Sequence, residues 1–288
     1  MLRIAVPNKG SLSDPAAQML TEAGYRQRTD SKDLALLDAD NDVEFFYLRP
    51  RDIAVYVGEG TLDVGLTGRD LLLDSGTDAE EILGLGFGES TFHFAAPEAL
   101  ARQNVEADVG FESLAGRRVA TAYPGLVEAY LSERGVAAQV VRLDGAVETA
   151  VRLGVADAIA DVVSTGATLR QAGLAVFGEP ILRSEAILIC RPGSARAPGL
   201  SQLVRRLQGV LVARRYVMVA YDVPAAVVER ACALTPGIES PTISPLRNPD
   251  WFAVSALVLK KETNRVMDDL WDLGARGILV TDISACRL

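Results

Sequence analysis

Short apolar runs alternate with stretches of helical periodicity through the first 190 residues of the chain. The run at residues 3–6 precedes an Ala- and Leu-rich stretch that begins at Ser13 and ends before Gly24, which is the pattern of a strand, a turn and a capped helix. The same order recurs at residues 44–57 and 63–72. Strands that alternate with helices in this way form largely parallel sheets, so the pattern predicts an α/β fold.

A second group of the same kind opens after Gly116. Its apolar runs lie at residues 119–122, 139–143 and 158–162, with helical stretches at 124–135 and 145–153 between them. The later run at 186–190 predicts a strand that returns to the first sheet, so that the chain crosses twice between two lobes and leaves a cleft. We therefore expect a discontinuous first domain, residues 1–92 with 180–214, around a second domain of residues 93–179.

The pattern changes after the Pro- and Gly-rich stretch 191–199 and one further helix. Strands and helices in residues 215–288 follow the order βαββαβ, the ferredoxin-like arrangement. Val266, Leu270 and Leu273 recur at helical spacing and are expected in its core. This segment has no acid–base pair or phosphate loop, so we expect a regulatory or assembly role for it.

Composition narrows the class of protein. A chain of 288 residues with 49% hydrophobic and 23% charged residues can bury several cores. No apolar run is long enough to cross a membrane and no leader segment follows Met1, so we expect a cytoplasmic protein. Cys190, Cys232 and Cys286 lack the spacing of a zinc site or a disulfide framework, and we expect reduced thiols.

The net charge of −9 disfavours nonspecific binding to nucleic acid, which relies on Lys and Arg side chains that neutralise phosphates. It also means that any anionic substrate needs local cations and helix N-termini to overcome repulsion. Lys9 and Arg49 each follow a predicted strand, where ligand sites of α/β folds lie, and Arg69 occupies an equivalent turn. These three cations are the candidates for binding an anionic substrate, although a surface cation is more often simply solvated.

The sharpest chemical signal is residues 158–169, which join a buried strand, an acid, a hydroxyl-rich loop around a glycine and the first turn of a helix. This pattern is typical of a phosphomonoester-binding loop. Gly166 lets backbone N–H groups approach a phosphate, and Ser164, Thr165 and Thr168 add hydroxyl donors. On local sequence alone, a helix cap formed by Ser164 and Thr165 explains the motif equally well.

Several segments together resemble the long-form ATP phosphoribosyltransferase family, over nearly the whole chain. They are residues 7–12 (PNKGSL), 48–53 (LRPRDI), 65–70 (GLTGRD), 144–168 (from DGAVE to STGAT) and 236–242 (PGIESPT). The resemblance implies an enzyme that condenses N1 of ATP with 5-phosphoribosyl 1-pyrophosphate, the first step of L-histidine biosynthesis, under feedback inhibition by histidine. It implies homo-oligomers, from dimer to hexamer, and Mg²⁺ that arrives mainly with the substrate pyrophosphate.

The resemblance also implies a fold and a set of site residues. The expected fold is a two-lobed, periplasmic-binding-protein-like catalytic body with a C-terminal ferredoxin-like regulatory domain. Lys9, Arg49 and Asp161 are the expected catalytic residues. The expected substrate-binding residues are Gly68, Arg69, Asp70, Asp144, Gly145, Glu148, Asp161, Ser164, Thr165, Gly166, Ala167 and Thr168. The expected histidine-binding residues are Asp222, Ile238, Ser240, Thr242 and Gly277.

Asp157 and Asp161 stand four residues apart, whereas commoner phosphoribosyltransferases carry two adjacent acids. Four residues of extended strand span roughly 13 Å, so the two carboxylates cannot chelate one ion as an adjacent pair does. We therefore expect Asp161 to contact the ribose hydroxyls, or magnesium through a water, and Asp157 to be structural. Glu148, near the start of a helix, is a second candidate for the ribose hydroxyls, against the alternative of a solvated first-turn acid.

Two features imitate catalytic signals. His93, the only histidine, lies in the alternating strand 91–94 and is expected to be a strand residue rather than a general base. Residues 84–88 imitate a dinucleotide fingerprint but lack its spacing and the helix that should follow.

Two other classes of protein stay open on the residues alone. A two-lobed body with a double crossover also fits a solute-binding protein without catalysis, although the phosphate loop favours a phosphorylated ligand. The ferredoxin-like segment also fits a small-molecule sensor, which would not need Lys9, Arg49 and the 164–168 loop together.

Overall fold

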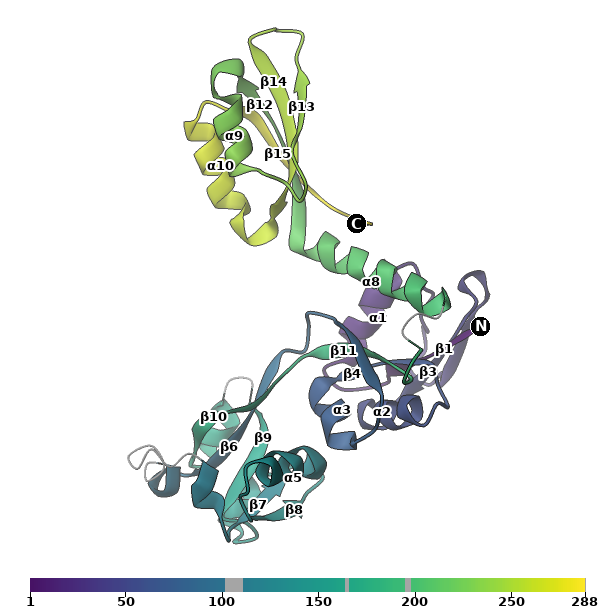
Figure 1. Cartoon of the computed structure of the whole chain (residues 1–288), viewed down its shortest axis with the longest axis vertical. Coiled ribbons are helices and arrows are strands. Elements are labelled where there is room, and N and C mark those ends of the chain that lie inside the picture. Colours follow the sequence, from purple (N-terminus) through teal and green to yellow (C-terminus); the bar gives the residue numbers. More distant parts are fainter. Residues whose placement is uncertain (102–110, 164–165, 195–197, 288) are drawn as a thin grey trace. The chain divides into compact units, whose positions relative to one another are not determined.

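The computed structural model describes residues 1–101, 111–163, 166–194 and 198–287 (Figure 1). The chain forms two compact units. One comprises Met1–Gln18 with Tyr25–Ser201, and the other comprises Met19–Gly24 with Gln202–Leu288. Among the residues that the structure describes, no helix is both long and apolar enough to cross a membrane.

The first unit contains two sheets, and we call each sheet with its helices a lobe. The first sheet has the order β2-β3-β1-β4-β11-β5. Its strands are β1 (Leu2–Pro7), β2 (Ala35–Asp38), β3 (Val43–Leu48), β4 (Val64–Gly68), β5 (Glu80–Gly84) and β11 (Ala186–Cys190), with helices α1 (Ser13–Glu22), α2 (Pro50–Gly58) and α3 (Arg69–Ser75) and the short 3-10 helix η1 (Ala39–Asn41). Strands β1, β3 and β4 are parallel, so their carboxyl ends share one edge. β11 returns to this sheet, as its apolar sequence predicted, and pairs antiparallel with β4 and β5.

The second sheet has the order β10-β6-β9-β7-β8. Its strands are β6 (Ser90–Pro97), β7 (Arg118–Thr121), β8 (Gln139–Arg142), β9 (Ala158–Val163) and β10 (Leu174–Ser184), with α5 (Pro124–Glu133), α6 (Thr149–Arg152), α7 (Ala167–Gln171) and the 3-10 helix η2 (Phe111–Leu114). Alternation along β6 buries Phe92 and Phe94 in one core and Ala95 in another, so the sheet has a core on each face. The chain crosses between the sheets after β5 and again between β10 and β11, which confirms the double crossover.

The helical stretch expected at residues 145–153 is shorter in the structure, where α6 covers only Thr149–Arg152. Gly145 and Ala146 have φ angles of 158° and 47°, and neither value is compatible with a right-handed helix. The prediction of a helix from Gly145 was wrong for that reason.

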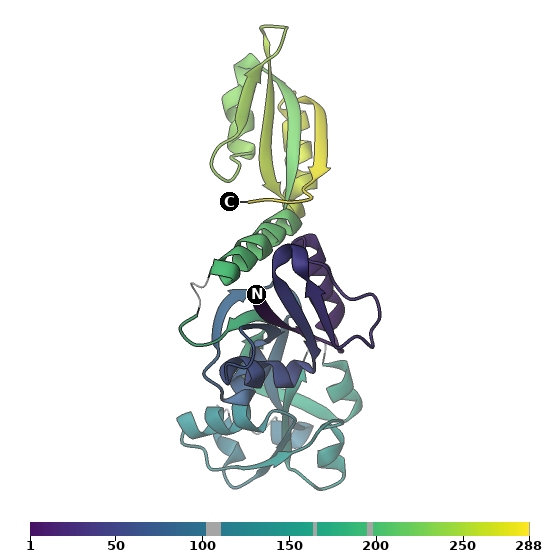
Figure 2. The same cartoon turned by 90° about the vertical axis from the view of Figure 1, so that its right-hand side faces the viewer.

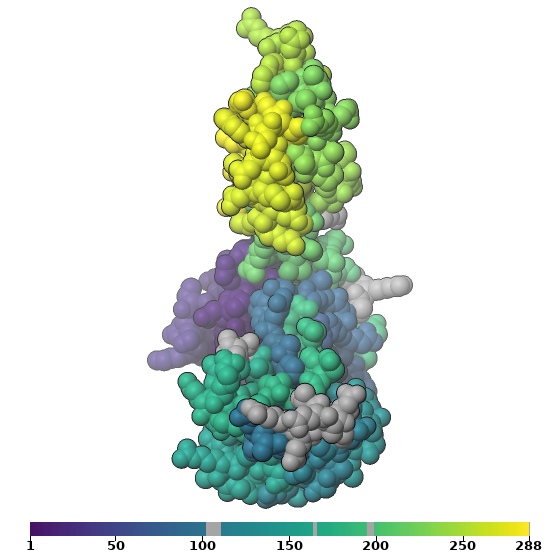
Figure 3. Space-filling view, turned by 90° about the vertical axis from the view of Figure 1, so that its left-hand side faces the viewer, coloured from purple at the N-terminus to yellow at the C-terminus, as the bar shows by residue number. Residues whose placement is uncertain are grey.

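The second unit contains most of α8 (Pro198–Arg215), from Gln202 onward, and a four-stranded antiparallel sheet of order β13-β14-β12-β15. Its other elements are β12 (Tyr216–Pro224), η3 (Ala225–Val227), α9 (Val228–Leu234), β13 (Thr242–Pro245), β14 (Trp251–Leu259), η4 (Lys260–Glu262), α10 (Thr263–Asp272) and β15 (Arg276–Asp282). This is the ferredoxin-like order that the sequence predicted. Val217, Val219 and Tyr221 pack with Val266 and Leu270 of α10, so the helices cover one face (Figure 1). Figure 3 is a space-filling view from that side, with the residues of the α10 region in yellow. Within the residues that the structure describes, no helix of this unit covers the other face of the sheet, which we call the open face (Figure 2).

Candidate active site

A cavity of about 420 Å³ lies at the carboxyl ends of β1 and β4. Lys9 and Ser11 line it from the loop after β1, Gly68 and Asp70 from the junction of β4 and α3, and Tyr123 from the loop after β7. Both lobes therefore contribute to its wall. The carboxyl ends of parallel strands are the usual ligand site in open α/β sheets.

Two cations at this edge have no ion-pair partner among the described residues. Pro7 of β1 and Leu48 of β3 are register partners. Arg49 directly follows the end of β3, and Lys9 lies two residues after the end of β1. Both side chains are exposed, and neither forms an ion pair or side-chain hydrogen bond within the described parts of the chain. Arg49 is the N-cap residue of α2, whose first residue is Pro50, so its charge stands beside a helix N-terminus. Two free cations here form a positive region suited to an anion.

Asp70 is buried and fixed by hydrogen bonds. Its backbone N–H donates to Oγ of Ser184 at 3.0 Å, and that hydroxyl donates to Oδ1 of Asp70 at 2.9 Å. The hydroxyl of Tyr123 also bonds the Asp70 carboxylate. Burial, followed by the charge of Asp70, raises the pKa of Tyr123, so the phenol stays protonated and acts as a donor. The cavity thus has a rigid polar wall.

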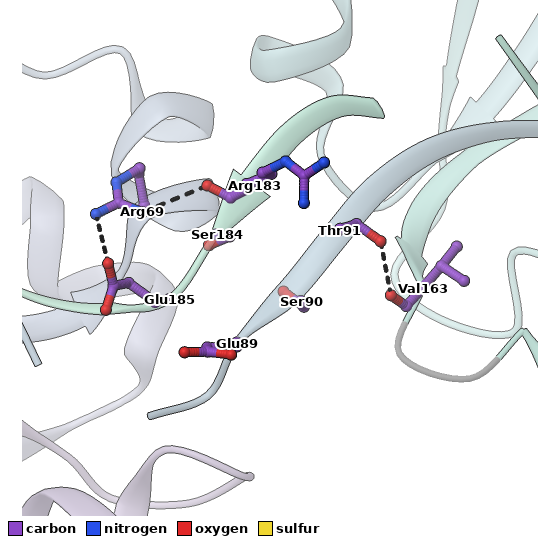
Figure 4. Close-up of a pocket in the computed structure, with 8 residues that line it drawn as sticks. All are labelled: Arg69, Glu89, Ser90, Thr91, Val163, Arg183, Ser184 and Glu185. Atoms are coloured by element: carbon purple, nitrogen blue, oxygen red, sulfur yellow. Dashed lines mark hydrogen bonds and ion pairs between the residues drawn. The ribbon is translucent and has the colours of Figure 1, made fainter. Parts of the chain in front are cut away.

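Arg69 points away from this wall. Its guanidinium donates to Glu81 at 2.9 and 2.6 Å. It also donates to Glu185 at 3.1 Å and to the carbonyl of Arg183 at 3.3 Å (Figure 4). The bonds to Glu81 raise the pKa of Arg69 most, and Glu185 adds to them. Arg69 lines a neighbouring cavity of about 420 Å³, along the two crossovers, together with Arg183 and Glu185. Its charge is therefore already neutralised by two carboxylates.

Asp161 lies near the carboxyl end of β9, and its Oδ1 accepts a hydrogen bond from the N–H of Val162 at 2.7 Å. Burial raises the pKa of Asp161, the bond from Val162 opposes this, and the charge of Glu148 raises it further. Glu148 is the N-cap residue of α6. Asp144 and Gly145 are exposed in the loop before it, and Asp144 pairs with Arg142 at 3.5 Å. The two acids expected at the ribose are thus close enough to affect each other.

The phosphate loop is described from Gly166 onward. Gly166 has φ of +67°, in the left-handed region, and stands as the N-cap of α7. Ala167 and Thr168 form the first turn of that helix. The predictions for Ser164 and Thr165 fall outside the described residues. A left-handed N-cap explains why this position carries glycine.

Asp157 lies at the opposite end of the strand. Its carboxylate accepts bonds from the backbone N–H and the guanidinium of Arg118 at 2.9 to 3.3 Å. These bonds lower the pKa of Asp157. Asp157 therefore joins the amino ends of β7 and β9, far along the strand from Asp161.

His93 lies in β6 opposite Asp161 of β9. Its Nδ1 is buried and has no hydrogen-bond partner among the described atoms. Burial lowers the pKa of His93, and the charge of Arg183 lowers it further. The ring is therefore neutral near pH 7.

Three of the five residues predicted for histidine share the open face of the second unit's sheet. Asp222 of β12 has its Oδ2 within 3.7 Å of where a Cβ on Gly277 would lie. Thr242 of β13 is the register partner of Ser255, one strand away from β12, and alternation places its side chain on the same face. Ile238 and Ser240 are exposed in the loop before β13.

The side chains offer little for direct binding of a metal ion. Within the part of the chain that the structure describes, no cluster of three or more His, Cys, Asp or Glu side chains could hold a metal ion.

Comparison with known proteins identifies the family. The model described as ATP phosphoribosyltransferase matches residues 49–209, and the model described as HisG, C-terminal domain, matches residues 213–285. The ATP phosphoribosyltransferases of Pseudarthrobacter chlorophenolicus and Salinispora tropica are each 63% identical to the chain, and both comparisons cover 100% of each chain. The chain belongs to the ATP phosphoribosyltransferase family.

Membership of this family makes the protein a pentosyltransferase, as the sequence motifs predicted. Among solved structures, the chain resembles the ATP phosphoribosyl transferase (HisG:HisZ) complex from Thermotoga maritima. The two are 25% identical, with a TM-score of 0.61, and the match covers 73% of this chain and 98% of that one. The two-lobed α/β body is thus a fold found in the family.

For this ATP phosphoribosyltransferase family member, sequence reasoning missed Tyr123 and Ser184. Tyr123 follows a predicted strand and precedes Pro124, so its position at a strand end was a usable signal. Ser184 carried no such signal, because its partner Asp70 lies 114 residues earlier. Only the folded chain brings these groups together.

Proposed function

We propose that the chain transfers the phosphoribosyl group of 5-phosphoribosyl 1-pyrophosphate to N1 of ATP, which forms N1-(5-phosphoribosyl)-ATP and pyrophosphate and begins L-histidine biosynthesis. The observation that carries the proposal is the pair of unneutralised cations, Lys9 and Arg49, at adjacent strand ends beside the cavity. In a chain of net charge −9, such a pair supports the binding of a polyphosphate at this edge of the sheet.

We assign each part of the substrates to the residues whose charge and hydrogen-bonding groups suit it. Lys9 and Arg49 bind the pyrophosphate or triphosphate, and Gly68 and Asp70 line the ATP pocket. The loop from Ser164 to Thr168 binds the 5-phosphate, and Asp161 and Glu148 accept bonds from the ribose hydroxyls. Asp144 and Gly145 border the same region. Arg69 supports the ATP pocket indirectly, because Glu81 and Glu185 already occupy its guanidinium.

The reaction needs positioning and charge stabilisation rather than a covalent nucleophile. N1 of adenine attacks C1 of the ribose as the C1–O bond to pyrophosphate breaks, and the bonding electrons leave with the pyrophosphate. Mg²⁺ enters as part of that pyrophosphate and neutralises charge on it, which suits an ion that keeps several waters. Asp161 contacts the magnesium through a water or the ribose directly. Lys9 and Arg49 stabilise the charge that grows on the leaving group.

One assay tests the proposal. The protein is incubated with ATP, 5-phosphoribosyl 1-pyrophosphate and Mg²⁺, and the absorbance of phosphoribosyl-ATP is followed. Product should form only when all three are present. A protein that binds ATP and phosphoribosyl pyrophosphate without releasing pyrophosphate would instead be a binding protein.

Arg49→Ala should lower kcat about 10- to 100-fold and change the KM for ATP much less. The charge on pyrophosphate grows in the transition state, and a charge-assisted bond to a guanidinium is worth about 1.5–3 kcal/mol. Steady-state kinetics of Arg49→Ala, Arg49→Lys and Lys261→Ala measure this. Lys261 is another exposed cation, so its variant controls for net charge. An unchanged kcat in Arg49→Ala would remove Arg49 from catalysis.

The ferredoxin-like unit is proposed to bind histidine and to inhibit the enzyme. A free amino acid presents an ammonium and a carboxylate. Asp222 suits the ammonium or the imidazole, and Ser240 and Thr242 suit the carboxylate. Ile238 adds an apolar contact, and Gly277, with φ of +59°, keeps the space beside Asp222 open.

Asp222→Ala should weaken inhibition by histidine about 10- to 100-fold and leave the uninhibited rate unchanged. The loss of one charge-assisted contact, about 1.5–3 kcal/mol, sets this range. Inhibition curves are compared with those of wild type and of Asp268→Ala, which removes an exposed acid from α10. Equal potency in all three proteins would place the effector elsewhere.

We propose three domains. The first is discontinuous and comprises residues 1–92 with 180–214, the second comprises residues 93–179, and the third comprises residues 215–288. We also propose that the active enzyme is a homo-oligomer. The two sheets of the first unit and the separate sheet of the second support three domains, whereas residues 202–214 belong to the second unit and not to the first. Light scattering of the purified protein measures the oligomer directly.

A further inference from the structure

Arg51 joins the two lobes of the first unit. It lies on α2 of the first lobe, where its guanidinium forms an ion pair with Asp74 of α3. The same guanidinium donates to the carbonyl of Ala122, in the second lobe, at 2.8 Å. Its Cζ lies 5.0 Å from the centre of the Tyr123 ring, also in the second lobe. One side chain thus contacts three groups on both sides of the cavity.

Asp74 of the first lobe also contacts the second lobe directly. Its side chain is 6% exposed, and its Oδ1 accepts bonds from the backbone N–H groups of Gly125 at 2.9 Å and Leu126 at 3.3 Å. These are N–H groups of the first turn of α5, whose own N-cap residue supplies no side-chain bond. A carboxylate of one lobe therefore caps a helix of the other while it neutralises Arg51.

Gly125 allows this close approach. A Cβ at this position would lie 2.4 Å from the backbone carbonyl oxygen of Asp74, and a backbone atom cannot move aside as a flexible side chain can. We call Arg51, Asp74 and Gly125 the brace. Helix α3 and helix α5 can meet at this distance only because position 125 has no side chain.

The brace leads directly to the wall of the cavity. Tyr123 immediately precedes α5, and the Arg51 guanidinium lies over its ring. The ring also packs edge-on against Phe92, with 5.1 Å between the ring centres. The Tyr123 hydroxyl forms a hydrogen bond with Asp70. Asp70 in turn is held by Ser184 at the second crossover. The position of one cavity wall relative to the other is therefore set by contacts on both sides of Tyr123.

We propose that Arg51 and Asp74 are positioning residues: they hold the two lobes at the separation that the reaction needs before substrates bind, and they act through Tyr123 and Asp70. The proposal rests on the proposed function, in which one substrate is bound mainly by each lobe. A misplacement of about 1 Å between reacting groups costs on the order of 100-fold in rate. Loss of the brace should therefore lower kcat more than it raises KM.

The test uses the full chain with Arg51→Met, Asp74→Asn, the double variant and Arg51→Lys. Arg118→Met is the matched control, because Arg118 forms an Arg–Asp ion pair inside one lobe and its side chain is 41% exposed, as is that of Arg51. Each protein is assayed for kcat, for the KM of both substrates and for thermal unfolding. Hydrogen exchange of the amides at the start of α5 reports the brace without any substrate.

Arg51→Met and Asp74→Asn should each lower kcat at least 10-fold, with KM values within about 3-fold of wild type. The double variant should be no worse than the poorer single variant, because both changes break one connection. Arg51→Lys should recover part of the rate, and exchange at the start of α5 should increase in Asp74→Asn.

Three results would overturn the proposal: an unchanged kcat in Arg51→Met and Asp74→Asn, an equal loss in Arg118→Met, or losses that multiply fully in the double variant. Failure of the proposed function is distinguishable from these. In that case wild type makes no phosphoribosyl-ATP, while the increased exchange in Asp74→Asn still reports whether the brace exists.

Discussion

Gly166→Val should abolish detectable binding of 5-phosphoribosyl 1-pyrophosphate in titration calorimetry while the protein stays folded. A branched side chain at this position occupies the space through which the 5-phosphate approaches the backbone. Space alone does not oppose the folded state, because the nearest described atoms to a Cβ here are those of Arg170 at 3.4 Å and Val163 at 3.7 Å. The left-handed φ of +67° adds strain of about 1–3 kcal/mol for valine.

Backbone strain must be separated from the loss of the phosphate site. Gly135 has the same φ of +67° and nothing within 4 Å of a Cβ, so Gly135→Val imposes a similar strain away from the phosphate loop. Gly166→Asn tests a side chain at this position with less backbone strain, because asparagine tolerates the left-handed backbone conformation. Binding should survive in Gly135→Val and fail in Gly166→Asn. Full affinity in Gly166→Val would assign the 5-phosphate to another part of the chain.

The sequence predicted the parts of the fold that depend on local periodicity. The apolar run at 186–190 has no polar residue, and β11 is buried throughout in the structure. Strand and helix order in residues 215–288 was likewise sufficient to predict the ferredoxin-like sheet. Strand β10 was not predicted, because it carries Gly178 at φ of +68° and its register with β6 shifts between Phe177 and Leu182. A bulge interrupts the alternation on which such a prediction depends.

In the candidate site too, local sequence pattern predicted some features, whereas others depend on residues that are distant in the sequence. That Lys9, Arg49 and Arg69 stand at strand ends follows from local pattern. Whether each charge is free depends on distant residues: Glu185, which binds Arg69, lies 116 residues away from it. Sequence alone therefore could not separate the two unpaired cations from the one that two carboxylates neutralise. The brace was equally hidden, because Arg51 and the carbonyl that it binds are 71 residues apart.

Asp161→Asn should lower kcat about 10- to 100-fold while leaving the substrate-free protein at least as stable as wild type near pH 7. The lost contact to ribose or to magnesium-bound water is charge-assisted, and about 1.5–3 kcal/mol corresponds to that range. The stability change follows from the raised pKa of Asp161. Burial and the charge of Glu148 disfavour its ionised form, and asparagine has no ionised form.

The pH dependence has a definite sign. Because the folded-state pKa of Asp161 lies above the ordinary value of 3.8, its favourable contribution is complete at low pH and is lost as pH rises through the folded-state pKa. Asp161→Asn should therefore gain stability relative to wild type as pH increases from about 4 to 7. Thermal unfolding across this range, without substrates, measures the difference.

Asp157→Asn is the matched control, because Asp157 precedes β9, Asp161 lies near its carboxyl end, and their pKa values move in opposite directions. Arg118 lowers the pKa of Asp157, so the stability that Asp157 contributes is present above its unfolded value and is lost as pH falls through the lowered one. Asp157→Asn should thus be less stable than wild type at pH 7, approach it in acid, and retain its kcat. The reverse assignment, with activity lost in Asp157→Asn and stability lost in Asp161→Asn, would mean that the substrate binds at the amino end of β9 and not beside the phosphate loop.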